Sequence, residues 1–143
     1  MLRVIALVSG LYDVLVGALL FLAAPQLAAA FGSPPVTPAV FAETNALFLM
    51  CVGLGYALPY RDPVRWRAYL WIMGPLLKFG GAFVFLRDVL LRGSPRSFLL
   101  FALSDGVLAA VTLAALWREP APPATGAIDG AAGSAGRSAP RRR

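Results

Sequence analysis

Four long apolar runs constrain the fold of this chain more than any other feature of its sequence. They cover about residues 3–24, 38–60, 66–88 and 97–117. A helix rises about 1.5 Å per residue, so roughly 20 apolar residues cross the hydrocarbon core of a bilayer. The chain has 143 residues, 59% hydrophobic and 14% charged, which leaves no room for a separate water-soluble domain. The sequence therefore predicts an all-α fold, an integral membrane four-helix bundle in residues 1–117.

Three of the predicted helices begin at the same kind of residue pair. The pairs are Thr37-Pro38, Asp62-Pro63 and Ser94-Pro95. In each, a side-chain oxygen can cap the helix and the proline loses no hydrogen bond at the first helical position. Gly93 is placed to end the third helix. The first connection, residues 25–36, is uncharged and leaves two alternatives open, a short interfacial helix over residues 26–31 or an irregular loop.

Charge placement predicts the topology. The basic residues outside the runs form a larger group, Arg3, Arg61, Arg65, Arg67, Arg118 and the tail arginines, and a smaller group, Arg87, Arg92 and Arg96. The positive-inside rule then places both termini in the cytoplasm, with the protein in a bacterial inner membrane. The first run is expected to be an uncleaved span, because Asp13 and Pro25 interrupt any signal-peptide pattern. Residues 118–143, rich in Pro, Ala, Gly and Ser, are predicted to form a disordered basic tail.

Each apolar run contains one ionisable residue well inside it, and we expect these residues to form an intramembrane polar cluster. They are Asp13, Glu43, Lys78 and Asp105. Lys78 and Asp105 would both lie about 18 Å from the cytoplasmic end of consecutive antiparallel helices. An ion pair between them is therefore the most economical way to keep the ammonium charged inside a membrane.

Three carboxyls and one ammonium cannot all be ionised in a membrane without leaving negative charge uncompensated. We expect at least one of Asp13 and Glu43 to be protonated at neutral pH, or a cation to be bound. The same groups could instead only lock the four helices together through hydrogen bonds, which is an equally weighted alternative.

The second and third helices carry further features of interest. Glu43 shares one face of its helix with Leu47, whereas Asn45 and Tyr56 lie on the opposite face, which is predicted to meet a partner or a second subunit. In the third helix, Gly74 and Pro75 stand just before Lys78. Because Pro75 cannot donate a hydrogen bond to Trp71, a kink is expected there. Cys51 is interpreted as a small buried apolar residue.

Several sequence segments together resemble a known group of proteins. The segments are GLYDVLVGALLFLAAP, YALPYRDP, GPLLKFGG and SDG, within residues 5 to 117. They are similar to the small four-helix bacterial DoxX-like membrane proteins and their uncharacterised relatives. The resemblance implies a four-helix membrane fold and, for some members, a role as accessory subunits of quinone-linked membrane oxidoreductases. It carries no cofactor ligand over to this chain.

Composition narrows the function. The chain has no His and a single Cys, so it lacks the ligands of zinc or haem sites and the partners for a disulfide, and we predict no cofactor and no metal. The net charge of +6 lies in loops and the tail, where it favours membrane lipid rather than nucleic acid as a partner. We expect a non-catalytic accessory or assembly subunit, forming a homodimer or a larger membrane complex. The alternative is a small proton-coupled transporter of a lipophilic cation, acting as a dimer; an enzyme of lipid or quinone is less favoured.

Overall fold

The fold is entirely helical over residues 1–119, the part of the chain that this computed structural model describes. The elements are α1 (Leu2–Ala30), α2 (Val40–Gly55), α3 (Ala57–Arg61), α4 (Arg67–Trp71), the π-helical turn η1 (Ile72–Leu76), α5 (Leu77–Leu91), the 3-10 turn η2 (Arg96–Phe98) and α6 (Leu99–Arg118). They combine into four helical stretches that are long and apolar enough to cross a membrane. The all-helical class is thus confirmed, whereas the predicted tail lies, from residue 120 on, outside the described residues.

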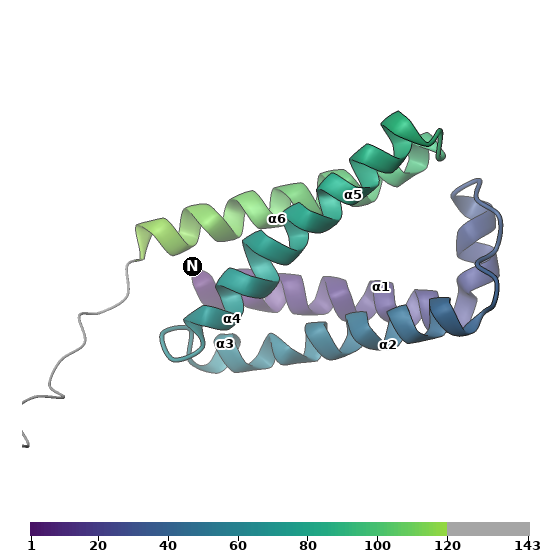
Figure 1. The fold of residues 1–143 in the computed structure, drawn as a ribbon. Helices are drawn as coiled ribbons and strands as arrows, with labels where there is room; N and C mark the ends of the chain where they lie inside the picture. Colours follow the sequence, from purple (N-terminus) through teal and green to yellow (C-terminus); the bar gives the residue numbers. More distant parts are fainter. Residues whose placement is uncertain (120–143) are drawn as a thin grey trace, which may run out of the picture.

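The four stretches form two pairs that meet at one end and diverge at the other (Figure 1). α1 lies along α2, and α5 lies along α6. We call the region where the pairs meet the packed end; it contains Leu2, Tyr56, Leu70 and Leu116. The opposite region, where the pairs diverge and the last turns of α1 cross between them, is the open end (Figure 1).

The packed end holds the hydrophobic core. Its cluster of buried residues comes from all four helical stretches: Leu2, Ile5, Ala6, Val52, Tyr56, Leu70, Ala115 and Leu116. The Tyr56 ring meets the Tyr69 ring edge-on, with centroids 5.3 Å apart. The Tyr69 hydroxyl donates a hydrogen bond of 2.5 Å to the Val52 carbonyl. These contacts hold the α4 segment against α2 and fix the end at which the two pairs join.

Glycines let α1 and α2 approach closely. A Cβ atom added to Gly53 would lie 2.8 Å from the Gly10 carbonyl oxygen, and one added to Gly10 would lie 2.9 Å from the Gly53 carbonyl oxygen. Gly17 is similarly close to the Ala46 carbonyl, at 2.8 Å. Small residues at a helix interface allow the two backbones to touch. In lipid, where the hydrophobic effect does not drive helices together, such close van der Waals packing is a main source of helix association.

The first connection is helical at its start. Ala23 departs from helical geometry, with φ −142° and ψ 34°, and Pro25 follows it inside α1. The chain bends there and continues as helix to Ala30, so the short helix left open by the sequence is present (Figure 1). Gly32, with φ +68°, then turns the chain toward α2.

Of the other residues expected to begin or end helices, only some do so in the structure. Asp62 accepts hydrogen bonds from the backbone of Val64 and Arg65, at 3.2 and 3.0 Å, as expected of a capping side chain. Ser94 instead donates to the Asp88 carboxylate. Gly93, with φ +71°, follows the end of α5. Thr37 makes no capping hydrogen bond among the described residues, and α2 begins at Val40, after the proline.

At the expected kink, the third helical stretch contains the π-helical turn η1, which includes Gly74 and Pro75. A Cβ on Gly74 would lie 2.6 Å from the Thr112 Cγ2 atom of α6. A π-turn shifts the backbone hydrogen-bond pattern at a place where proline has no N–H to donate. Such turns are frequent at functional sites. Lys78 follows two residues after η1, on the first turn of α5.

Candidate functional site

A buried ionic cluster joins α1, α5 and α6. The Lys78 Nζ atom lies 2.7 Å from Asp13 Oδ1 and 3.4 Å from Asp105 Oδ1. The Lys78 and Asp13 side chains are only 4% and 3% exposed, whereas the Asp105 side chain is 18% exposed. The sequence predicted the pairing of Lys78 with Asp105; the structure contains it and adds Asp13 as the closer partner.

The two carboxylates therefore occupy different positions in the cluster. Asp13 is buried and holds the ammonium at a charge-assisted hydrogen-bond distance. Asp105 makes the longer contact and is the more accessible of the two. The sequence could not distinguish them, because depth along a helix does not give the distance across a bundle.

Tyr12 and Ser104 complete the cluster, and sequence reasoning missed both. The Tyr12 ring lies 5.0 Å from the Lys78 Nζ atom, within cation–π range. The Tyr12 and Ser104 hydroxyls are 2.7 Å apart. Each is the residue immediately before an aspartate of the cluster, Asp13 or Asp105, and this repeated pairing of a hydroxyl with an acid was the available signal.

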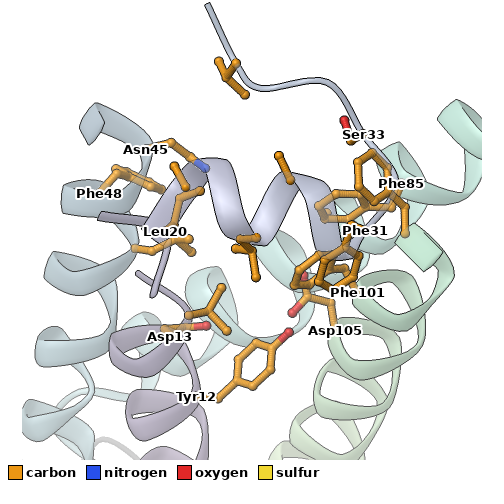
Figure 2. A pocket seen from close by; sticks show the side chains of 18 of the residues that line it. Tyr12, Asp13, Leu20, Phe31, Ser33, Asn45, Phe48, Phe85, Phe101 and Asp105 are labelled. Carbon is orange, nitrogen blue, oxygen red and sulfur yellow. The ribbon is translucent and has the colours of Figure 1, made fainter. Parts of the chain in front are cut away.

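A cavity of about 430 Å³ adjoins the cluster. Figure 2 shows it with Tyr12 and Asp105 on one side, Asn45 and Phe48 on another, and the Phe31, Phe85 and Phe101 rings along a wall. Asp13, Lys78 and Asp105 are its charged lining residues. The remaining wall is predominantly apolar, as in most small-molecule sites.

Four phenylalanines form a connected aromatic wall at the open end. The Phe31 ring stacks on Phe101 at 4.8 Å between centroids, and Phe85 stacks on Phe101 at 5.3 Å. Phe98 contacts Phe85 and Phe31 at 5.9 and 6.2 Å. Phe31 directly follows α1, and the other three belong to α5, η2 and α6, so only the folded chain brings the four rings together.

The bent segment of α1 closes part of the cavity. Ala24, Leu27, Ala28 and Phe31 all line it. The Ser97 hydroxyl donates a 2.6 Å hydrogen bond to the Phe31 carbonyl and so ties this segment to η2 across the open end. The bend at Ala23 thereby changes the direction of α1 from running along α2 to crossing toward the other helix pair (Figure 1).

The structure places several α2 residues differently from expectation. Glu43 is exposed near the start of α2 and lies outside the cluster, while Asn45 is exposed and also lines the cavity. Tyr56 is buried in the core, so it cannot present a partner surface, and Cys51 is exposed. Close packing against α1 selects the face of α2 that carries small residues, and this leaves Glu43 and Cys51 on the exposed side. That face contains Ala42, Ala46 and Gly53.

No protein-family model matches this chain, and neither a curated protein nor a solved structure matches it significantly.

Proposed function

We propose that this protein is an integral membrane protein whose cavity binds a lipophilic cation. The carrying observation is a 430 Å³ aromatic cavity whose charged lining consists of two carboxylates and one ammonium. When all three groups are ionised, the cluster has a net charge of −1. A lipophilic cation would neutralise this charge and place its apolar body against the phenylalanine wall.

Asp105 is the carboxylate that would bind the cation. Asp13 is buried against Lys78, whereas Asp105 is partly exposed beside the cavity and lies farther from the ammonium. Protonation of Asp105 would release a bound cation, and this exchange supports a proton-coupled transporter. The Tyr12 and Phe101 rings lie near this carboxylate and supply faces that attract positive charge (Figure 2).

A role as a non-catalytic accessory or assembly subunit ranks second. It rested in part on the α2 face of Asn45 and Tyr56; Tyr56 is buried in the core, which leaves only the exposed Asn45 of that pair for a partner surface. An accessory role also gives no reason for a cavity with charged residues at its base. The relationship to DoxX-like proteins and the dimer also remain proposals, because no matching protein supports either of them.

The membrane setting rests on the surface of the bundle. Large apolar side chains are exposed along every helical stretch, including Leu11, Phe48, Phe83 and Leu103. In water such a surface would drive aggregation, whereas lipid tails solvate it. The start of α1, the α3–α4 connection and the end of α6 meet at the packed end and carry Arg3, Arg61, Arg65, Arg67 and Arg118. We propose that this end faces the bacterial cytoplasm.

Reporter fusions test this orientation. Fusions at Asp62 and after residue 143 should report a cytoplasmic location, and fusions at Gly32 and Gly93 the opposite side. A reporter at Asp62 on the extracytoplasmic side would contradict the proposed topology.

Equilibrium binding of tetraphenylphosphonium to the full chain in detergent tests the proposed function. Asp105→Asn should weaken binding at least about tenfold, because it removes one of the two carboxylates that attract the cation. Glu43→Gln is the matched control, since it removes an exposed carboxylate outside the cluster and should leave binding unchanged. Equal loss in both variants, or no loss in Asp105→Asn, would contradict the proposal.

A further inference from the structure

Three buried polar atoms on the packed-end side of the ionic cluster have no hydrogen-bond partner within residues 1–119. They are Ser9 Oγ, Asp13 Oδ2 and the Tyr56 hydroxyl oxygen. The three residues are 0%, 2% and 1% exposed. Buried polar groups in proteins almost always find a partner, whether protein or water, so three such atoms call for a physical explanation.

The three side chains converge on one place. Ser9 and Asp13 are one helical turn apart on the buried face of α1. Between them along the chain is Gly10, where an added Cβ would lie only 3.0 Å from the Tyr56 Cβ. This close approach brings the Tyr56 ring against α1. The Ser9 and Tyr56 hydroxyls are close enough to interact, but the pair does not reach hydrogen-bond geometry, and Asp13 lies near the same hydroxyl.

We infer that Ser9, Asp13 and Tyr56 form a binding site for a buried water molecule. A water offers two donors and two acceptors, and buried waters typically make about three hydrogen bonds to otherwise unpaired groups. Ionised Asp13 only accepts, whereas the Ser9 and Tyr56 hydroxyls both donate and accept. One water can therefore donate to Asp13 Oδ2, donate to one hydroxyl and accept from the other.

The water gives Asp13 a fixed role beside Lys78. Lys78 binds Asp13 Oδ1 at 2.7 Å, and the water satisfies Oδ2. Both carboxylate oxygens then accept a hydrogen bond, which is the full set of contacts that a carboxylate paired with a buried ammonium needs. Asp13 thus remains the counter-ion of Lys78. The water site itself is independent of the ligand; the consequence that Asp105 is left free for a cation rests on the proposed function.

A structure of the full chain in a lipid environment, at a resolution that shows ordered water, tests the inference. We expect density for one water within about 3.2 Å of at least two of the three oxygens. No such density, with the Tyr56 hydroxyl bonded directly to Ser9 or Asp13, would overturn the inference.

Infrared spectroscopy supplies a second readout that a purely structural contact would not change. We expect Asp13 to be ionised at neutral pH and to give no carbonyl band of a protonated acid. The spectra of the native chain and of Asp13→Asn should therefore agree in the region of that band. Tyr56→Phe keeps the ring that fills the core and removes one partner of the water. A band of protonated Asp13 should therefore appear in this variant. Tyr69→Phe is the matched control, because its hydroxyl has a direct partner, the Val52 carbonyl. An identical Asp13 signal in Tyr56→Phe and the native chain would overturn the role given to the water.

Binding of tetraphenylphosphonium to the same samples separates the two proposals. Water density together with absent cation binding would overturn the proposed function and leave the water site standing. Cation binding without water density would overturn the water site and leave the proposed function standing.

Discussion

The two ends of this bundle use aromatic residues in opposite ways. At the packed end, Tyr56 is buried in the core and meets Tyr69 edge-on, so the rings fill the space between helices. At the open end, Phe31, Phe85 and Phe101 stack around a cavity. The difference shows that helix pairs which diverge from one tightly packed end can leave a cavity at the other end while the packed end keeps them in place.

The ionic cluster lies at the boundary between the two regions. Asp13 and Lys78 are buried like the packed end, and Asp105 is partly accessible like the open end. We therefore expect substitutions of Asp13 and Lys78 to affect stability, and substitution of Asp105 to affect binding. The predictions below test this division from the largest expected effect to the smallest.

Lys78→Met should destabilise the bundle by about 3 to 5 kcal/mol, because it leaves two carboxylates near a buried position without their ammonium. The double variant Lys78→Met with Asp13→Asn should recover most of this loss, whereas Lys78→Met with Asp105→Asn should recover less. Thermal unfolding in detergent measures the free energies of these three variants and of the single variants Asp13→Asn and Asp105→Asn, which complete the two cycles. Additive losses for Lys78 and Asp13 would show that these two residues do not act as a pair.

Gly53→Ala should cost about 1 to 3 kcal/mol, because its new methyl group would lie 2.7 Å from Val14 Cγ2 and 2.8 Å from the Gly10 carbonyl oxygen. Gly80→Ala on α5 is the matched control. No atom of the described residues outside its own helix lies within 4 Å of its new methyl group, so this change should be neutral or slightly stabilising. Comparable unfolding temperatures for the two variants would contradict the claim that the close α1–α2 contact stabilises the bundle.

Ser97→Ala should have the smallest effect on stability, about 1 kcal/mol, because it removes one hydrogen bond to the Phe31 carbonyl. Its effect should be local. Amide hydrogen exchange should increase over residues 25–31 and stay unchanged over residues 5–16. Ser33→Ala serves as the control, at a half-buried residue whose hydroxyl, within residues 1–119, donates to the neighbouring Pro34 carbonyl and so ties no two elements together. A uniform increase along α1 would mean that the two ends are not mechanically separate.

The helical fold could be predicted from the sequence because apolar run length reports directly on helices of this size. The ionisable residues were equally visible, since Asp13, Lys78 and Asp105 interrupt runs that otherwise contain few polar groups. The expected association of Lys78 with Asp105 followed from depth alone, and antiparallel neighbouring helices preserve depth.

What could not be predicted depends on how the helices rotate and bend. Glu43 and Asn45 are two residues apart on α2, and the sequence could not show which of them faces the other helices. The rotation is set by contacts such as Gly53 against Gly10, which involve residues from distant parts of the chain. The aromatic wall was hidden for the same reason, because Phe31 joins Phe101 only after α1 bends at Ala23.

The charge preference of the cavity tests the central claim most directly. Tetraphenylphosphonium and tetraphenylborate have nearly the same shape and opposite charges, so their affinities for the native chain in detergent, each corrected for protein-free micelles, compare charge alone. Because the cluster carries two carboxylates and one ammonium, we predict that the cation binds at least about tenfold more tightly than the anion. Equal affinities, or tighter binding of the anion, would contradict the assignment of Asp105 as the group that binds the ligand.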